Sequence, residues 1–360
     1  KKIRDNCKKY PGSEWMFFLY QKVKKDYSIV TADVALKNVK INKWNAKDIL
    51  VIQHMNDKVS EKLISLGATP FIIFSLESPL YQGDFYDNAS FFIKKFKHKL
   101  LFDGLLSLSN EEDDNQKQVR FPSFSSEDDS SIKSKEKINK IVFVCSNQYI
   151  HYKSIKMVRS LDDISWYFRK LISEFRSNSN ISKTLNHANF QLHEKRLELL
   201  TAFLDLDYID LYGKNWDSYN NLPSKWKRSL LALLGEPKDR FILNKLNTIS
   251  NYRYCLCVEN FEYPGYITEK IVHSIVARTV PIYFGAPNIE KYFPSECFID
   301  ARRYKNVESM YDYIENLDED TYQKMIIAGQ NHLKSDSGKL HSYEGFSENI
   351  VDLINLELKN

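Results

Sequence analysis

The sequence predicts an α/β protein with two domains, because the chain is long and strand-like and helix-like segments alternate in both halves. At 360 residues it exceeds what one ordinary core holds. In the first half, the apolar runs DILVIQ (48–53) and PFIIFSL (70–76) enclose the helix-like segment NDKVSEKLISLGA. Strand, helix and strand in this order predict parallel pairing. The same alternation begins again at KIVFVCSN (140–147).

The second half contains a compact strand–helix–strand unit. LHEKRLELLTAFLDL (192–206) has apolar residues at helical spacing, and YIDLYG (208–213) is typical of a strand closed by glycine. YRYCLCVEN (252–260) is expected to be a strand, TEKIVHSIVAR (268–278) a helix and VPIYFGAP (280–287) the next strand.

Changes of composition suggest where the domains begin and end. We expect one α/β domain over residues 1–106 and a second over 140–330. Residues 107–139 carry acidic blocks and serines around a small apolar island, VRFPSF, a composition typical of a linker or mobile loop. Docking of the island near a substrate cleft is the alternative. Residues 331–360 predict a helical tail.

Composition also excludes some classes of protein. The hydrophobic share of 43% and the aromatic share of 14% are those of a globular protein. A formal charge of +4 without a basic stripe argues against nucleic-acid binding, but it suits a protein that handles phosphates or touches an anionic membrane surface. Apolar runs stay short of the ~20 residues that cross a bilayer, and no signal-peptide pattern is found at Lys1.

The five cysteines indicate reduced thiols in a cytosolic protein, because their number is odd and their spacing shows no disulfide framework. Cys255 and Cys257 alternate within a strand-like run, and no second ligand pair follows at zinc spacing. We therefore expect no metal site.

The loop before the helix at 268–278 has the features of an anion site. In an open α/β sheet, ligands gather at the carboxyl ends of strands, where helix N-termini point their free amides at anions. Lys270 would supply a positive charge there, and the neighbouring Glu269 could orient a sugar hydroxyl or a ribose. Neither a GxGxxG fingerprint nor a P-loop is present in this loop. The alternative is a solvated helix start with two surface charges.

The whole segment YRYCLCVENFEYPGYITEKIVHSIVARTVPIYFGAPNIEKYFPSECFID resembles the donor-binding signature of the α1,3-fucosyltransferases of glycosyltransferase family 10. That signature has a strand, F-E-N, a short loop, Y-[IV]-T-E-K, a helix and V-P-[IV]-x-x-G. Weaker similarities flank it: SLESP (75–79) resembles the family's F-E-S-P segment, VFVCSN its V-x-S-N strand end, and RLELLTAFLDLDYIDLYGKNW its R…L…D-x-Y-G stretch.

The resemblance implies the GT-B architecture, in which two Rossmann-like domains face each other across a cleft. It implies transfer of L-fucose from GDP-β-L-fucose, with inversion and no obligatory metal or cofactor, to a hydroxyl of a GlcNAc-type or related glycan or glycolipid acceptor. One alternative is a GT-B transferase that uses another nucleotide sugar, such as a GDP-linked deoxy or amino sugar, in surface polysaccharide synthesis. Another is a non-catalytic nucleotide-sugar or glycan-binding module.

The same resemblance assigns roles to residues. It places Lys270 and Arg196 by the donor diphosphate, and Tyr266, Glu269 and Asn260 around the sugar and ribose. Three further residues complete the expected donor site, namely Thr268 and Glu259 from the same loop and Asn147 from the V-x-S-N strand end.

Glu77, the glutamate of the E-S-P segment, is the expected catalytic base. An inverting transfer needs a carboxylate that takes the acceptor hydroxyl's proton from the side opposite the leaving group. Without a metal, the charge on the leaving GDP must be met by fixed cations and a helix N-terminus. Taken singly, Glu77 also fits an ordinary exposed glutamate before a Pro turn, and Arg196 also fits a solvated helix face.

The chain departs from the family pattern around the donor loop. Val258 and Phe261 stand where the family has phenylalanine and serine, so the loop is expected to differ in shape. An insertion (148–192) separates Asn147 from Arg196, which makes Arg159 an alternative phosphate ligand.

The expected location is the bacterial cytoplasm, with peripheral association at the inner membrane. The Golgi lumen is the alternative if an N-terminal anchor has been removed.

Overall fold

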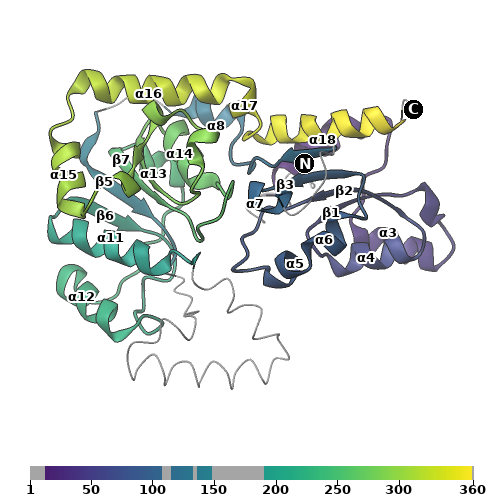
Figure 1. The fold of residues 1–360 in the computed structure, drawn as a ribbon, viewed down its shortest axis with the longest axis horizontal. Helices are drawn as coiled ribbons and strands as arrows, with labels where there is room; N and C mark the ends of the chain where they lie inside the picture. Colours follow the sequence, from purple (N-terminus) through teal and green to yellow (C-terminus); the bar gives the residue numbers. More distant parts are fainter. Residues whose placement is uncertain (1–12, 108–114, 133–135, 148–189, 359–360) are drawn as a thin grey trace. The chain divides into compact units, whose positions relative to one another are not determined.

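The computed structural model describes residues 13–107, 115–132, 136–147 and 190–358. The chain forms two compact units, and each is taken by itself (Figure 1). The first unit comprises residues 1–125 and 338–360, and the second comprises residues 126–337.

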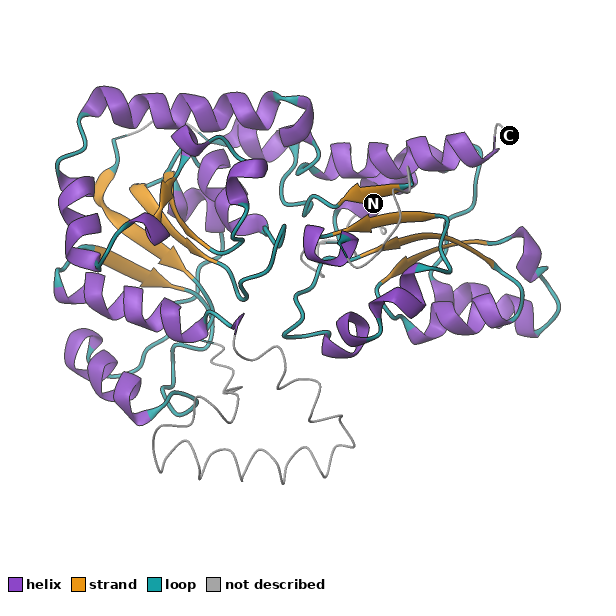
Figure 2. Ribbon diagram, in the orientation of Figure 1, coloured by secondary structure: helices purple, strands orange, loops and turns teal. Residues whose placement is uncertain are grey.

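The first unit is a parallel four-stranded sheet in which the strand order follows the chain order, with helices on both faces (Figure 2). Its central residues are fully buried, since both faces are covered: Ile72 pairs with Ile52 on one side and with His98 on the other. The strands are β1 (Leu50–His54), β2 (Thr69–Phe74), β3 (His98–Leu101) and β4 (Gln116–Gln118).

Two helices from opposite ends of the described chain pack together in this unit. The ring of Trp15, at the start of α2, lies 5.0 Å from the ring of Phe346 in α18 and 5.6 Å from that of Phe74 in β2. The unit's helices are α2 (Trp15–Val23), α3 (Ala32–Lys40), η1 (Ala46–Asp48), α4 (Lys58–Ser65), α5 (Gly83–Asp87), α6 (Ala89–Ile93), α7 (Asp103–Leu106) and α18 (Tyr343–Leu358). Its domain also holds the final residues of α17 (Asp336–Lys339).

The second unit is a parallel five-stranded sheet with the order β6-β5-β7-β8-β9. Because β6 pairs with one edge of β5 while β7 pairs with the other, the direction of winding reverses between β5 and β7. Such a switch point, at the carboxyl ends of the strands, is where open α/β sheets bind ligands. The strands are β5 (Ile138–Val144), β6 (Ile209–Tyr212), β7 (Tyr252–Val258), β8 (Val280–Phe284) and β9 (Ile299–Asp300).

Helix α14 follows the loop at 259–268, and its apolar face packs against β7 and β8. This packing fixes the position of the loop's last residues. Ile271, Val272, Ile275 and Val276 are buried at helical spacing on that face. The unit's helices are α8 (Ser126–Ser131), α11 (His193–Asp205), α12 (Ser224–Leu234), α13 (Lys245–Ile249), α14 (Glu269–Val276), η4 (Ile289–Lys291), η5 (Ser295–Cys297), η6 (Ala301–Arg303), α15 (Val307–Glu315) and α16 (Glu319–Lys334).

The α/β fold predicted from the sequence is confirmed in both halves, but the observed units divide the chain differently from the predicted domains. The last residues of the expected tail (331–360) belong to the first unit from Gly338 onward. Within the expected linker (107–139), β4 joins the first sheet. Val119 and Phe124, from the apolar island, are buried there, because the island supplies enough apolar surface to be ordered.

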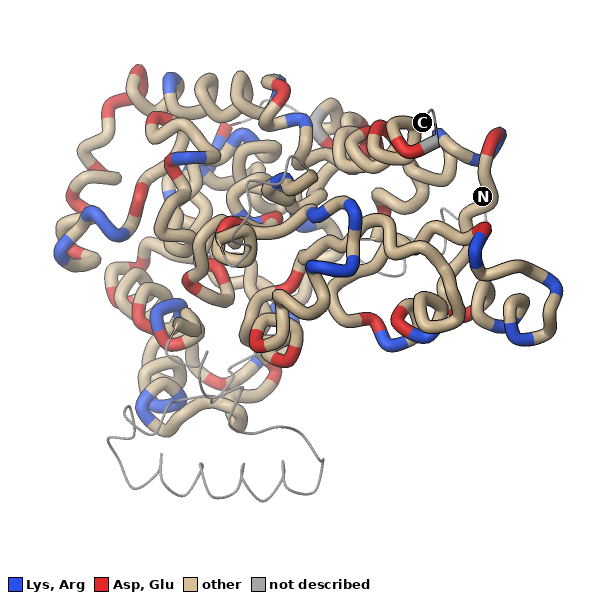
Figure 3. The backbone as a smooth tube through the Cα atoms, turned by 45° about the vertical axis from the view of Figure 1, so that its right-hand side comes forward, with Lys and Arg blue, Asp and Glu red and all other residues tan. Residues whose placement is uncertain are grey.

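Charged residues of both signs are interspersed along the backbone of both units (Figure 3). This agrees with the mild net charge and with the absence of a basic stripe from the sequence. No helix in the described ranges combines the length and apolar character required to cross a bilayer.

Candidate functional site

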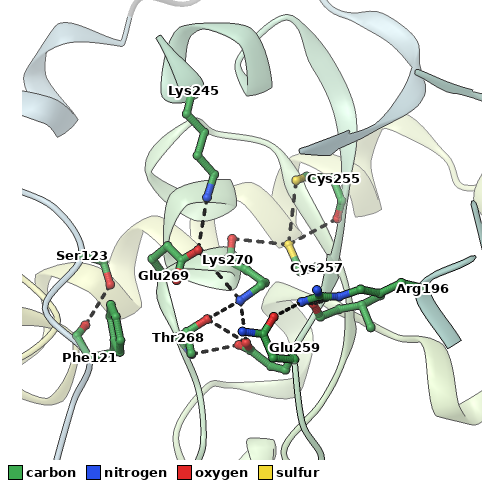
Figure 4. Close-up of polar contacts among 12 residues, drawn as sticks. Phe121, Ser123, Arg196, Lys245, Cys255, Cys257, Glu259, Thr268, Glu269 and Lys270 are labelled. Carbon is green, nitrogen blue, oxygen red and sulfur yellow. Dashed lines mark hydrogen bonds and ion pairs between the residues drawn. The ribbon is translucent and has the colours of Figure 1, made fainter. Parts of the chain in front are cut away.

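The predicted donor loop lies at the switch point of the second sheet, between the end of β7 and the start of α14. Glu259 follows β7 directly, and Thr268 is the residue that precedes the first turn of α14. Arg196 reaches the end of β7 from α11 (Figure 4). The two ends of the donor loop and the distant helix α11 therefore bring their polar side chains to the end of β7.

Lys270 is held in place by two neighbours. Its Nζ donates to Glu259 Oε2 at 2.9 Å and to Thr268 Oγ1 at 2.8 Å. An ammonium has three N–H donors, so one remains for a ligand. The Lys270 side chain keeps 16% of its surface exposed.

Glu269 lies between two lysines. Its Oε1 is 3.4 Å from Lys245 Nζ and 3.9 Å from Lys270 Nζ. Burial by itself would raise the pKa of Glu269, but Lys270, Lys245 and His273 together hold it well below its usual range. Burial would likewise lower the pKa of Lys270, and the carboxylates of Glu259 and Glu269 raise it. Both side chains are therefore charged at neutral pH.

Arg196 is anchored along one edge of its guanidinium. Nε and Nη2 donate to the Val258 carbonyl at 3.2 and 2.8 Å, and Nη2 also donates to Asn260 Oδ1. Nη1 makes no hydrogen bond to the residues that the structure describes, so its two N–H groups are available to an anion. Arg196 contacts the backbone carbonyl of Val258, so this contact does not require a particular side chain at position 258.

The charged side chains around the donor loop carry a net positive charge. Arg196, Lys245 and Lys270 contribute three cations against the carboxylates of Glu259 and Glu269. Helix α14 adds the positive end of its dipole at the same point. The site can therefore attract an anion, with one donor from Lys270 and two from Arg196 as direct contacts.

Two aromatic residues of the donor loop are buried in the second unit. Tyr266 is buried, and its backbone N–H donates to Tyr263 O at 3.0 Å. Phe261, which replaces the family's serine, is 1% exposed and lies 6.0 Å, ring to ring, from Phe190. It also forms an antiparallel bridge with Gln191. The ring at position 261 thus ties the loop to the segment before α11.

Asn147 contacts a different segment. Its Nδ2 donates to Ser218 O at 2.8 Å and to Asn221 Oδ1 at 3.2 Å. Asn221 Nδ2 donates in return to Asn147 O at 3.0 Å. The side chain therefore holds the 218–221 segment beside the end of β5. Arg159, the alternative phosphate ligand, lies outside the described residues.

Glu77, the expected base, belongs to the first unit and follows β2 at its carboxyl end, as predicted. It is half-buried. The loop around it is held by two contacts: Tyr86 Oη donates to the Glu77 carbonyl at 2.7 Å, and Leu76 N–H donates to His54 Nε2 at 3.2 Å. The base assignment itself stays a prediction.

Sequence reasoning missed Lys245 and His54. Lys245 starts α13, next to the helix-capping residue Asn244, and reaches Glu269 only because α13 packs on α14. A lysine in the first turn of a helix, where cations are disfavoured, is the signal that could have identified it. His54 has no comparable local signal, because its partner Leu76 is 22 residues away.

Within the described ranges, no group of three or more His, Cys, Asp or Glu side chains could hold a metal ion. Cys255 and Cys257 are free thiols with their sulfurs 3.8 Å apart. The metal independence expected from the family stays a prediction.

Parts of the chain are similar in sequence to known fucosyltransferases. Over 106 residues it is 33% identical to the alpha-(1,3)-fucosyltransferase FucT of Helicobacter pylori, which covers 29% of this chain and 22% of that protein. Over 86 residues it is 35% identical to the GDP-fucose protein O-fucosyltransferase 3 of Xenopus laevis, covering 23% of this chain and 18% of that protein. The matched stretch spans about a fifth of the length of each relative.

Among solved structures, a glycosyltransferase from Rickettsia africae superposes with a TM-score of 0.55 at 11% identity, covering 94% of this chain and 88% of that one. This likeness shows the fold alone, and the GT-B fold class expected from the sequence agrees with it. Residues 177–326 match the family described as glycosyltransferase family 10 (fucosyltransferase), C-terminal. Residues 177–326, less than half of the chain, are thus similar to the C-terminal domain of glycosyltransferase family 10, and the fucosyltransferase relatives agree with this similarity.

Proposed function

We propose that this protein is a glycosyltransferase that transfers L-fucose from GDP-β-L-fucose to a hydroxyl group of a GlcNAc-type or related glycan acceptor. The observation that carries the proposal is the cationic network of Lys270, Arg196 and Lys245 at the switch point. It lies within the segment that matches the fucosyltransferase family.

The donor half of the proposal rests on charge and geometry. A nucleoside diphosphate carries negative charge that grows as the bond between sugar and phosphate breaks, and fixed donors stabilise that charge. The remaining N–H of Lys270 and the Nη1 donors of Arg196 would meet the diphosphate. Glu269, ionised and 30% exposed, would accept hydrogen bonds from sugar or ribose hydroxyls. Tyr266, Asn260, Thr268 and Asn147 would shape the same pocket.

The chemical step is a single displacement. The acceptor oxygen attacks the anomeric carbon of fucose, the bond from that carbon to the phosphate oxygen breaks, and GDP leaves with the electron pair. Glu77 takes the acceptor's proton, and the anomeric configuration inverts. No step in this sequence calls for a metal or cofactor, because the two cations and the N-terminus of α14 supply the stabilising charge.

The candidate donors differ in their sugar. Phe261 stands where the family has serine and packs against Phe190, and this departure favours a second candidate, transfer of another GDP-linked deoxy or amino sugar. A non-catalytic nucleotide-sugar or glycan-binding module is the third candidate. The presence of Glu77 together with Glu269 and Lys270 argues against it, because binding alone does not need a base. The bacterial cytoplasmic location, its Golgi-lumen alternative and peripheral membrane association all stay predictions.

A thermal-shift screen against nucleotide sugars tests the donor. A ligand that binds only the folded state raises the free energy of unfolding, by an amount that grows with the logarithm of its concentration relative to its dissociation constant. We expect GDP-fucose and GDP to raise the melting temperature of the second unit, and UDP-sugars to leave it unchanged. A larger shift with GDP-mannose than with GDP-fucose would move the assignment to the second candidate. No shift with any GDP compound would contradict the proposal.

A further inference from the structure

Glu259 has no direct path to a ligand, although it lies in the predicted donor loop. Its side chain is 0% exposed. One carboxylate oxygen accepts the Thr268 backbone N–H at 2.8 Å, and the other accepts Thr268 Oγ1 at 2.7 Å and Lys270 Nζ at 2.9 Å. Burying a carboxylate is costly unless it is paired and hydrogen-bonded, and this one is paired and hydrogen-bonded by Thr268 of its own loop and Lys270 of the first turn of α14.

The neighbouring strand leaves room for this carboxylate. Gly285 follows β8, and a Cβ atom added there would lie 2.5 Å from Glu259 Cγ and 2.6 Å from Tyr283 Oη. Both distances are shorter than real Cβ contacts allow. The Glu259 backbone N–H donates to the Phe284 carbonyl at 2.9 Å, which fixes the two segments to each other.

The Glu259 carboxylate also changes which hydrogen bonds Thr268 makes at the start of α14. Thr268 stands at the N-cap position, where a hydroxyl usually accepts from the helix amides, but its side chain makes no such bond. Instead the hydroxyl donates to Glu259 and accepts from Lys270. The amides of the first helical turn are thereby left without a side-chain cap, and Lys270 is fixed by two acceptors.

We propose that Glu259 is a positioning residue for anion binding: its buried carboxylate holds Thr268 and the Lys270 ammonium in the geometry that receives a diphosphate, and Gly285 makes room for it. This role rests on the proposed function, since it assumes that the anion is the donor's diphosphate. The Glu259 carboxylate has two opposing effects on anion binding. It adds a negative charge to the site, which weakens the attraction of an anion. It also orders Lys270 and keeps it protonated, which strengthens anion binding.

Glu259→Gln decides which effect dominates. The amide has almost the same shape, but it places an NH₂ group against the donors of Thr268 or Lys270. If positioning dominates, the dissociation constant for GDP, measured by calorimetry, rises about tenfold or more at neutral pH. GDP binding by the variant should also weaken further between about pH 7 and pH 10, because Lys270 then keeps only Glu269 of the two carboxylates that raise its pKa. The wild-type affinity should stay nearly constant over that range.

Glu308→Gln is the matched control, because it makes the same change at an exposed carboxylate on α15. Its GDP affinity and pH profile should equal those of the wild type. Gly285→Ala should reproduce the Glu259→Gln phenotype without altering a charge, since its Cβ displaces the carboxylate. Unchanged or tighter GDP binding by folded Glu259→Gln would overturn the positioning role.

A second measurement needs no nucleotide. The reactivity of the Lys270 amine toward acetic anhydride can be followed against pH by mass spectrometry in the wild type and in Glu259→Gln. We expect Lys270 to remain protonated to higher pH in the wild type than in Glu259→Gln, because the variant keeps only Glu269 as a carboxylate partner. If Lys270 titrates alike in both proteins, the positioning role is wrong. Failure of wild-type protein to bind GDP would instead overturn the proposed function, and this comparison of amine titrations would still test the role of Glu259.

Discussion

Glu77 is the residue on which the catalytic part of the proposal depends. It follows β2 in a loop that Tyr86 and His54 hold in place. Glu77→Gln keeps the shape of the side chain but cannot accept a proton. We expect kcat for transfer to fall by about 10²–10⁴-fold, while GDP-fucose affinity stays unchanged.

Glu348→Gln, at an exposed carboxylate on α18 that pairs with Lys22, is a suitable control for Glu77. It should transfer at the wild-type rate. A Glu77→Gln enzyme as active as the wild type would remove Glu77 as the base.

Lys270 is the residue on which donor binding depends. Lys270→Ala removes a charge-assisted contact to phosphate, which contributes on the order of 1.5–3 kcal/mol, so GDP affinity should fall strongly. Lys305→Ala, at an exposed lysine of the same unit, should bind GDP as the wild type does. Equal GDP affinity in the two variants, measured by calorimetry, would contradict the anion-site interpretation.

His54, which contacts the Glu77 loop, should make the stability of the first unit depend on pH. Burial lowers the pKa of His54 to about 4, with a smaller opposing effect of Asp57, and its neutral Nε2 accepts the Leu76 N–H. In the unfolded chain the histidine has its ordinary pKa of 6.5. Below that pH the unfolded state therefore binds the extra proton first, and the first unit loses stability as pH falls from 6.5 toward about 4. The loss is on the order of 3 kcal/mol.

His54→Gln keeps an acceptor for Leu76 but cannot titrate, so it should reduce this pH dependence. Hydrogen exchange of the β1 and β2 amides at several pH values measures the effect in the first unit alone. An equally steep dependence in the variant would assign the effect to other groups.

At the scale of single elements, the turn after β6 is the most constrained. Gly213 has φ +138°, and a Cβ there would lie 1.8 Å from the Cys145 carbonyl oxygen at the end of β5. Gly213→Ala should therefore destabilise the second unit by about 1–3 kcal/mol through overpacking, in addition to backbone strain.

A comparison with Gly235→Ala separates the effect of overpacking from that of backbone strain. Gly235 follows α12 with φ +73° and ψ −154° and has no atom within 4 Å of an added Cβ, so only the conformational cost of about 1–3 kcal/mol remains. Denaturant unfolding compares the two variants. An equal loss of stability in the two variants would show that the backbone around Cys145 shifts to accept the added Cβ without a further cost in stability.

Elements also differ in how far the sequence reveals them. The helix expected at 268–278 is observed as Glu269–Val276, because its apolar periodicity and its polar start are local properties. Strand β4, by contrast, consists of Gln116, Lys117 and Gln118, which have no strand-like pattern. It forms because β3 offers a free edge, to which Lys99 and Leu100 bind it in register.

At the scale of the whole molecule, the chain returns to its first unit after completing the second. Ser347 Oγ in α18 donates to the Trp15 carbonyl at 2.8 Å, and Phe346 packs on Trp15 and is buried. Phe346→Ala should lower the stability of the first unit by about 3–5 kcal/mol. Hydrogen exchange should then accelerate in β1, β2 and β3 but not in β5, β7 and β8.

Phe91→Ala is the control, because that ring is 62% exposed on α6 and its loss should change stability by no more than about 0.5 kcal/mol. Faster exchange in both units of Phe346→Ala would mean that the two units unfold together.

The sequence by itself determined the two parallel α/β regions, the loop that leads into α14, and the family signature around Lys270. These features are encoded by residues close to one another along the chain, through periodicity and motif spacing. Only the tertiary structure decided that Arg196 is anchored on Val258, 62 residues away, and that Lys245 meets Glu269, 24 residues away. It likewise decided that Glu259 faces its own loop rather than a ligand, in the space that Gly285 leaves open. Such contacts depend on strand order and on how helices pack over the sheet, which no local pattern specifies.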